Sequence, residues 1–364
     1  MPSTPSSEKQ DRLRNDHLGI SLISKYYGIV FSIIIFVTLY IARGFLLPVF
    51  AALLISYTLV PAVRLLCHFH IPRVLAAFVV VAVAFSAAIY SLVALSGPAV
   101  AWLEKAPESF DKLSELTEVL KRPVENVNAA TEQLNEMTKG DERKRPLVVR
   151  LEDSSIGDLI LSQTPIVIGA AISTLILLFF LLAFGNVLLK RIVEISPRLS
   201  DKKRTVDIAR KIESSVSRYL VTVLAINVCL GCCVALSLHL LDFADPIFWG
   251  VMATTFNFIP YLGAVAGVCL LTFASMSTSG DLEYALLCPA VYFVLTLIEG
   301  NLVTPFILGQ SFTVNPIFII LVLLFLGWLW GIPGAIMAVP LLVVLKSAAQ
   351  EFESTRSIAV LLSK

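Results

Sequence analysis

Basic residues are absent from one very long stretch of this sequence. Not one Lys or Arg occurs between Tyr219 and Leu345. At the centre of a membrane helix a Lys or Arg costs about 2.5 to 3.5 kcal/mol, so an absence of this length indicates membrane interior. Charge is scarce in the whole chain of 364 residues, of which 15% are charged and 57% are hydrophobic. Soluble globular proteins have about 25% charged and about 45–50% apolar residues. The composition excludes an ordinary soluble domain and predicts an all-α, polytopic integral membrane protein.

Cysteine is present, but not in the pattern of a disulfide-stabilised or metal-binding protein. The six cysteines lie in or beside apolar runs rather than in the polar middle of the chain, which is not a disulfide framework. Cys229, Cys232 and Cys233 share a helical face, and the nearest further metal ligand, His239, is two turns away. We therefore predict small packing residues and no metal site.

Recognisable catalytic signatures are also missing. The sequence has no GxxxxGK(S/T) nucleotide loop, no HExxH zinc motif and no GxSxG nucleophile motif, and its four histidines are scattered. We predict no enzymatic activity and no cofactor. Any transport is expected to be secondary or passive, because the sequence has no recognisable nucleotide site.

Long apolar runs dominate what is present. A helix of about 20 apolar residues crosses the ~30 Å hydrocarbon core, and this rule predicts about eight transmembrane helices. Apolar residues recur every three or four positions within 99–164, which predicts helices in that polar segment. The expected organisation is a cytoplasmic tail (1–25), three transmembrane helices (26–98), a helical extracytoplasmic segment (99–164), a fourth transmembrane helix (165–189), a basic amphipathic cytoplasmic linker (190–218), a C-terminal transport bundle with discontinuous helices (219–346) and a cytoplasmic tail (347–364).

Short basic loops set the expected orientation. Arg64 and Arg73 lie in the connection between the second and third helices, and nine Lys or Arg lie within 190–218. Because basic loops stay in the cytoplasm, we expect the N-terminus there and the segment 99–164 outside. The apolar spacing of 190–218 fits a helix on an anionic leaflet, and an ordinary solvated loop is an equal alternative.

Three segments of the bundle are interrupted, namely 247–275, 282–303 and 315–346. In the first, Pro260 frees a backbone carbonyl, Gly263 permits non-helical dihedral angles, and Asn257 and Tyr261 add polar side chains. Free carbonyls beside an amide and a phenol can bind a cation or a small polar solute. A proline kink that only improves helix packing is the alternative for the same residues.

Glu299 is the ionisable residue of greatest interest, since apolar sequence precedes it. A carboxylate buried in a membrane costs several kcal/mol unless it faces protein or water. Together with Gly300, Asn301 and Pro305 it forms a polar, flexible helix end of the kind that transporters use for ions and substrates. We predict Glu299 and Asn301 as binding residues and Gly300 and Pro305 as hinge residues. A structural acceptor that fixes the break is the alternative role of Glu299.

Gly331, Pro333 and Gly334 follow two tryptophans in 315–346, a segment too long for one straight crossing. Aromatic bulk beside flexible backbone predicts a re-entrant loop or a gate. Tryptophans that sit at the headgroup level are an equal alternative.

The same residues carry a family resemblance. Phe258-Ile-Pro-Tyr-Leu-Gly263, Glu299-Gly-Asn-Leu-Val-Thr-Pro305 and the closing run 315–346 resemble the autoinducer-2 exporter family, also called PerM-like permeases. The resemblance implies eight spans, cytoplasmic termini, a homo-oligomer in a bacterial inner membrane and export of a small solute, with cation/proton antiport in some relatives. The family usually has Asn where this chain has Gly300, so the resemblance gives that position no amide role.

Three functions remain open at this point. The leading hypothesis is a secondary exporter of a small polar solute, such as an autoinducer-2-like signal or a related metabolite. The second is a Na⁺(Li⁺)/H⁺ antiporter, for which a membrane carboxylate is the minimum requirement. The third is a non-transporting scaffold or regulatory membrane protein that binds through 99–164. Expected partners are membrane lipids, a small molecule or ion and further copies of the chain, and no nucleic acid.

Overall fold

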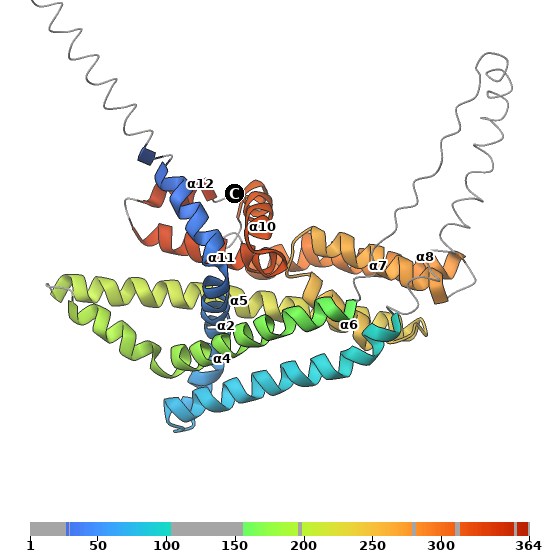
Figure 1. Cartoon of the computed structure of the whole chain (residues 1–364), viewed down its shortest axis with the longest axis horizontal. Coiled ribbons are helices and arrows are strands. Elements are labelled where there is room, and N and C mark those ends of the chain that lie inside the picture. Colours follow the sequence, from blue (N-terminus) through green and yellow to red (C-terminus); the bar gives the residue numbers. More distant parts are fainter. Residues whose placement is uncertain are drawn as a thin grey trace, which may run out of the picture.

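The computed structural model describes residues 27–28, 30–102, 156–195, 199–278, 282–309, 314–352 and 355–362. Its helices are Val30–Ile41, α2 (Arg43–His68), Arg73–Trp102, α4 (Ile156–Ile195), α5 (Leu199–Leu240), α6 (Pro246–Phe256), α7 (Leu262–Thr278), α8 (Leu282–Ile298), the π-helical η1 (Glu299–Val303), α9 (Thr304–Leu308), α10 (Pro316–Trp330), α11 (Ile332–Glu351) and α12 (Arg356–Leu362). Within the described ranges, six helices are long and apolar enough to cross a membrane (Figure 1). The prediction of an all-α polytopic membrane protein is confirmed. The tail 1–25 and most of 99–164 lie outside the described residues.

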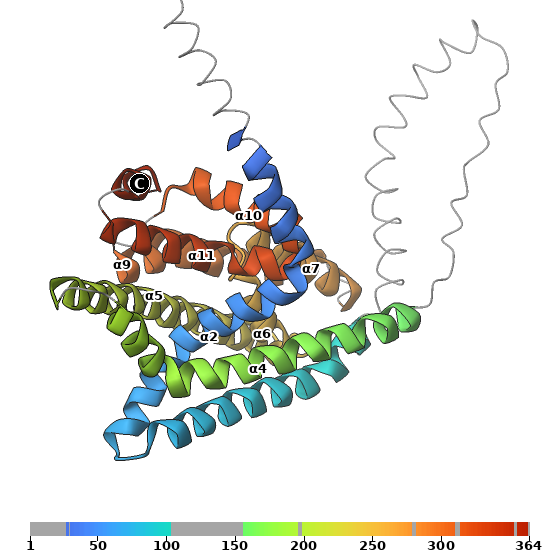
Figure 2. The ribbon, with the colours of Figure 1, turned by 60° about the vertical axis from the view of Figure 1, so that its left-hand side comes forward.

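The N-terminal spans pack through small and aliphatic side chains. The helix Val30–Ile41 leads into α2 across one non-helical residue, Ala42. α2, Arg73–Trp102 and α4 then share one core, and Figure 2 shows α4 running alongside the preceding helix. Small residues let membrane helices approach closely. The core consists of Ala52, Val60, Val63, Ala76, Ala77, Val80, Leu178, Leu182 and Ala183.

α5 is a single helix of 42 residues, about 63 Å long at 1.5 Å per residue. Residues 199–230 include neither Pro nor Gly, so nothing interrupts the helix where the predicted linker meets the fifth span. The basic segment 190–218 is thus not a separate element, because the end of α4 and the first half of α5 form it. Since α5 is about twice as long as the hydrocarbon core is thick, its basic half extends beyond the membrane.

α6 returns along α5 after the turn at residues 241–245. Gly231 of α5 and Gly250 of α6 lie so close that a Cβ on Gly231 would be 2.4 Å from the Gly250 carbonyl oxygen. A Cβ on Gly250 would in turn be 2.7 Å from the Cβ of Ala235. Small residues at four-residue spacing therefore bring the two backbones together, as in other membrane helix pairs.

α6 and α7 form a helical hairpin rather than one kinked span. The helices are joined by a turn at residues 257–261, and a Cβ on Gly263 would lie 1.8 Å from the carbonyl oxygen of Phe256. The far ends of the two helices also meet, since Trp249 of α6 and Leu271 of α7 belong to one buried cluster. The segment 247–275 therefore folds back on itself.

α10 and α11 form a second hairpin of the same kind. Its corner is Gly331, whose φ of 70° lies in the left-handed region where a residue without a Cβ is favoured. A Cβ on Gly334 would lie 2.1 Å from the carbonyl oxygen of Leu326, so the two helices touch just beyond the corner. The excess length of 315–346 is thus used to turn back, not to extend a span.

The two hairpins start at opposite ends of α5. α6 begins just after the C-terminal end of α5, whereas α10 begins beside Val314, which packs with Val216 in the first half of α5. In Figure 1 the α10–α11 pair lies over the left part of α5 and α7 and α8 lie over the right part. The tips meet, because Ile259 of the first hairpin packs against the cluster that contains Leu329 of the second.

This arrangement confirms the prediction of broken or re-entrant segments in the C-terminal half. It also identifies two of these segments as the hairpins α6–α7 and α10–α11. Two of the eight expected crossings are hairpins, and six helices of spanning length are present in the described ranges. These six include α11, which is one arm of the second hairpin, and they do not include Val30–Ile41, which lies in the first expected crossing. The helices of spanning length therefore do not correspond one to one with the expected crossings.

Candidate functional site

Two asparagines join the first hairpin to the middle of α5. The Nδ2 of Asn257, at the end of α6, donates a hydrogen bond of 2.9 Å to the Oδ1 of Asn227 on α5. The side chain of Asn227 is buried, with 2% of its residue surface exposed. Its own Nδ2 has no hydrogen-bond partner among the described residues. A buried donor without an acceptor costs about 1–3 kcal/mol, so this amide is a place where water or a polar solute would be stabilised.

The turn that carries Asn257 is held by its own backbone. Tyr261 has a φ of 64°, a left-handed conformation that is uncommon for a residue with a side chain. The N–H of Leu262 donates to the Pro260 carbonyl at 2.7 Å, and the N–H of Gly263 donates to the Ile259 carbonyl at 2.9 Å. Pro260 and Gly263 thus shape the tip, and Gly263 also allows α7 to touch α6.

Tyr261 does not take part in the asparagine pair. Its residue surface is 56% exposed, and the polar contact at this level is made by Asn227 instead. Of the four residues predicted in the first break, Asn257 is the one whose side chain the structure places in a buried polar contact.

Glu299 begins a π-helical turn, not an open break. The N–H of Thr304 donates to the carbonyl of Glu299, five residues back, and the chain then continues as α9. Pro305 occupies the first turn of α9, where its missing N–H is tolerated. The expected discontinuity at Pro305 is therefore a one-turn widening of a continuous helix. Single π-turns of this kind are frequent at functional sites.

The polar side chains of η1 are used locally. The hydroxyl of Thr304 donates to Oε1 of Glu299, and Nδ2 of Asn301 donates to the Leu297 carbonyl at 2.9 Å. Glu299 is half-buried, whereas Gly300 and Asn301 are exposed. The hydrogen bond from Thr304 fits the structural role that was the alternative for Glu299, and it leaves the second carboxylate oxygen to other partners.

η1 lies beside the same stretch of α5 as Asn227. Before it, Leu295 packs against the cluster that contains Leu230; after it, Leu308 packs against the cluster that contains Leu220. η1 itself contacts α5. Glu299 and the asparagine pair therefore flank one section of α5, although no direct contact between them is recorded among the described residues.

Aromatic packing surrounds the tip of the second hairpin. Nε1 of Trp330 donates to the Leu39 carbonyl at 3.3 Å, and its ring centroid lies 5.5 Å from that of Phe50. Trp328 stacks on Phe36 with a centroid distance of 5.3 Å. The tip is thus fixed to Val30–Ile41 and α2.

The predicted hinge residues do not form one group in space. Gly331, Pro333 and Gly334 lie in the aromatic tip, at the corner and in the first turn of α11. Gly300 and Pro305 lie in η1 and α9. The residues predicted for hinge and gating roles therefore lie in two parts of the molecule.

The sequence model described as "AI-2E family transporter" matches residues 29–354. The chain belongs to this family. It is 27% identical to the AI-2 transport protein TqsA of Escherichia coli (strain K12) over 333 residues, which cover 88% of this chain and 90% of TqsA. It is 31% identical to YrrI of Bacillus subtilis (strain 168) over 170 residues, covering 47% of each chain. It is also 29% identical to YhhT of E. coli K12 over 147 residues, covering 40% of this chain and 42% of YhhT.

Asn227 is the residue of this AI-2E family transporter that sequence reasoning missed. It stands in the apolar run 219–241, which contains no Pro and no second amide side chain. A signal was nevertheless present, because a side-chain amide in a membrane helix needs a polar partner. Asn227, Gly231 and Ala235 are spaced four residues apart, which places the amide on the face that packs against α6.

Proposed function

We propose that this AI-2E family transporter is a secondary exporter of a small polar solute across a bacterial inner membrane. The solute binds where the two hairpin tips meet beside the middle of α5. The observation that carries the proposal is the buried Nδ2 of Asn227, which lacks a partner among the described residues and lies next to the turn of the first hairpin.

Membrane physics supports a binding role for this region. Turns at membrane depth persist only where protein or a water-filled cavity covers them, and both hairpins place a turn there. Discontinuous helices near the midplane are the usual binding elements of secondary transporters. Hairpins that start at opposite ends of α5 bring one turn to the site from each side, an arrangement that suits alternating access.

The solute is expected to carry hydroxyl or carbonyl oxygens. The Nδ2 of Asn227, which has no partner among the described residues, is a donor. The half-buried carboxylate of Glu299, in η1 beside the same section of α5, is an acceptor. A hydroxylated signal such as autoinducer-2 has both kinds of group, and TqsA is named as an AI-2 transport protein. Because basic segments usually stay in the cytoplasm, the basic residues at the end of α4 and the start of α5 support a cytoplasmic N-terminus.

One observation favours Na⁺(Li⁺)/H⁺ antiport as the second candidate. Glu299 and the Thr304 hydroxyl are adjacent, and carboxylate and hydroxyl oxygens suit small hard cations. The segment that would serve a scaffold lies mostly outside the described residues, and no contact within them favours that role. Homo-oligomerisation agrees with the helix Arg73–Trp102, of whose most apolar window only 6% is buried.

The test measures efflux of autoinducer-2 from proteoliposomes. Asn257→Ala is expected to slow efflux about tenfold, the effect of one lost hydrogen bond of roughly 1.4 kcal/mol. Thr255→Val is the matched control, because that exposed side chain bonds only within its own helix to the Val251 carbonyl. Equal efflux rates for both variants would show that the hairpin turn is not part of the transport site.

Glu299→Gln separates the two candidates. Proton coupling predicts that this variant loses the pH dependence of flux, and a proton-sensitive dye reports antiport when Na⁺ or Li⁺ is added. Solute export that is not coupled to protons through Glu299 predicts that the variant keeps the pH dependence of the unchanged protein and that Na⁺ or Li⁺ gives no dye response. A variant with unchanged rate and unchanged pH dependence leaves Glu299 with the structural role that its hydrogen bond from Thr304 describes.

A further inference from the structure

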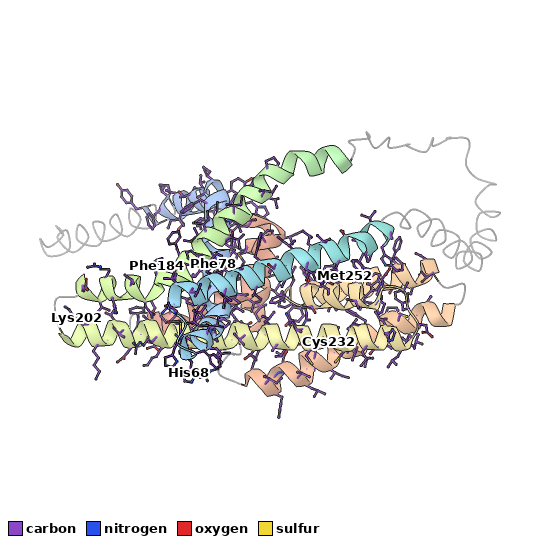
Figure 3. The ribbon with its side chains drawn as sticks, turned by 90° about the horizontal axis from the view of Figure 1, so that it is seen from below. His68, Phe78, Phe184, Lys202, Cys232 and Met252 are labelled. Carbon is purple, nitrogen blue, oxygen red and sulfur yellow. The ribbon has the colours of Figure 1, made fainter. Side chains whose placement is uncertain are left out.

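A large cavity lies far from the hairpin tips, where α2 and α4 end and α5 begins. Its volume is about 1130 Å³, and neither Asn227 nor Glu299 lines it. Figure 3 shows this end of the molecule on the side of His68 and Lys202, away from Cys232 and Met252. Its lining comes from α2, from Arg73, from the last part of α4 and from the first half of α5.

Basic side chains outnumber acidic ones around this cavity. The basic residues in its lining are Arg64, Arg73, Lys190, Arg210 and Lys211, and the acidic ones are Glu194, Asp207 and Glu213. Most of the acids are already paired: Glu213 with Arg64 at 2.7 Å and Glu194 with Arg191 at 2.9 Å. Positive charge is therefore left over at the cavity wall.

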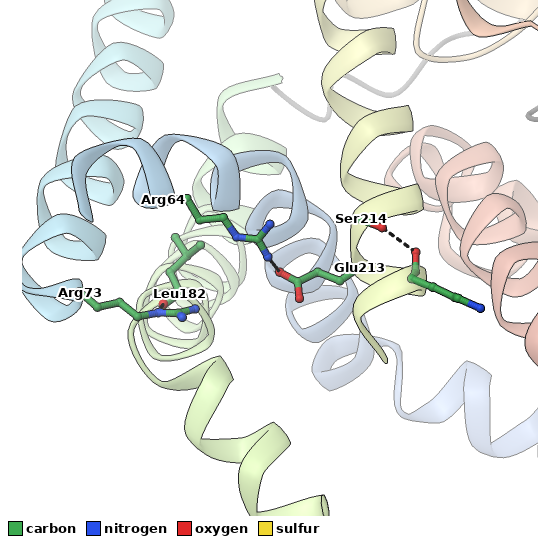
Figure 4. Close-up of polar contacts among 6 residues, drawn as sticks. Arg64, Arg73, Leu182, Glu213 and Ser214 are labelled. Carbon is green, nitrogen blue, oxygen red and sulfur yellow. Dashed lines mark hydrogen bonds and ion pairs between the residues drawn. The ribbon is translucent and has the colours of Figure 1, made fainter. Parts of the chain in front are cut away.

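Three of the cations are available for an anion. Nε of Arg73 donates to the Leu182 carbonyl at 2.9 Å, which fixes the guanidinium and leaves its terminal nitrogens for other acceptors (Figure 4). Lys190 and Arg210 are exposed, and no ion pair of either is recorded among the described residues. A fixed guanidinium with two mobile cations suits a phosphate group, which has several acceptor oxygens.

The depth of the cavity matches that of lipid headgroups. Its α5 lining runs from Val206 to Ser214, and the apolar part of α5 begins after Arg218. At 1.5 Å per residue, the cavity lies roughly 6–18 Å beyond the apolar part, in the polar layer of the membrane. Its floor includes Val60 and Leu182, so an apolar tail can enter beneath a charged head.

We propose that this cavity binds the phosphate group of an anionic amphiphile. Arg73, Lys190 and Arg210 hold the phosphate, and the aliphatic floor accepts the attached chain. Two sources have this chemistry, a phospholipid of the surrounding leaflet and a soluble phosphate ester. Asp207 at the same wall opposes the anion and limits its affinity. Occupancy would join α2, α4 and α5 at the basic end of the molecule.

The experiment measures binding to the purified full-length protein. Nanodiscs of phosphatidylcholine with increasing phosphatidylglycerol test the lipid source, and glycerol 3-phosphate and inorganic phosphate added to protein in neutral detergent test the soluble source. Thermal stabilisation and native mass spectrometry report occupancy. Loss of binding is compared between cavity variants and variants of cations on α5 that do not line the cavity.

Lys190→Gln and Arg210→Gln are each expected to weaken binding about tenfold. Their controls are Lys203→Gln and Arg218→Gln on α5, which remove exposed cations that do not line the cavity. Asp207→Asn is expected to strengthen binding, because it removes a negative charge from the wall.

Each outcome decides the proposal. Selective loss with the cavity variants and gain with Asp207→Asn support it, and the arm in which binding occurs identifies the source. Equal losses in cavity and control variants would show only a diffuse attraction to basic helices and would overturn it. The absence of saturable binding of any of these phosphates would overturn it as well.

Discussion

The hairpins α6–α7 and α10–α11 are built alike but end in different surroundings. In each, a glycine beyond the turn lets the second helix touch a carbonyl near the end of the first, at Gly263 and at Gly334. The first tip presents an amide to a second amide, Asn227, within a close helix pair. The second tip presents Trp330 to aromatic and aliphatic residues of the N-terminal helices.

This difference indicates that the two similar hairpins have different roles. An apolar tip packed on aromatic rings has its contacts satisfied, and it holds the second hairpin against Val30–Ile41 and α2. A polar tip with an amide donor left over is less stable than it could be, because an unpaired buried donor has a cost. Proteins keep such costs mainly at functional sites, which makes the first tip the candidate for solute contact.

Adding a methyl group at either hairpin glycine should have the largest effect. A Cβ on Gly263 would lie 1.8 Å from the Phe256 oxygen, and one on Gly334 would lie 2.1 Å from the Leu326 oxygen. Backbone atoms cannot rotate away, so each Ala variant should lose on the order of 3 kcal/mol of stability. Unfolding in detergent measures the loss. Gly300→Ala is the control, since its Cβ would meet nothing within 4 Å; equal stability of all three would refute the close helix contact.

Truncation of the aromatic tip should have a moderate effect. Trp330→Ala leaves a hole in a cluster where this residue is 7% exposed. The variant should lose about 2 kcal/mol of stability, less than in a soluble protein because lipid is also apolar. Trp328→Ala, at 66% exposure, should lose less than about 1 kcal/mol. Thermal unfolding of the two variants gives the comparison. A larger loss for Trp328 would mean that stacking on Phe36, not burial, anchors the tip.

Composition and helical breaks were sufficient to predict the membrane class and the positions of the interrupted segments. A lack of Lys and Arg over more than a hundred residues follows from the cost of charge in hydrocarbon. Pro260 and Pro333 restrict the backbone, and Gly331 permits dihedral angles that other residues avoid. The direction of the chain after each break could not be predicted. It depends on Gly263 and Gly334 touching carbonyls, and a glycine that permits contact looks the same in sequence as one that permits bending.

The candidate site was predicted only where a local signal existed. Asn257 was found because it adjoins Pro260, whereas its partner Asn227 lies thirty residues away and becomes notable only through the packing of α5 on α6. Pro305 predicted an open break near Glu299, but a π-turn absorbs the missing donor and keeps the helix continuous. Such compensation depends on which carbonyl a neighbouring N–H reaches, and single residues do not reveal that.

Asn227→Leu should have the smallest effect on stability and a large one on transport. The change removes the hydrogen bond from Asn257, but it also removes the unpaired donor, and Asn257 is only half-buried and can reach water. These two effects are each about 1 kcal/mol and opposite in sign, so stability should change by less than about 1 kcal/mol. Efflux should fall at least about tenfold, because the donor that contacts the solute is lost. Cys229→Leu, an exposed site on the same helix, controls for added apolar volume. If Asn227→Leu transports normally while Trp330→Ala does not, the aromatic tip contacts the solute and the roles of the two hairpins are reversed.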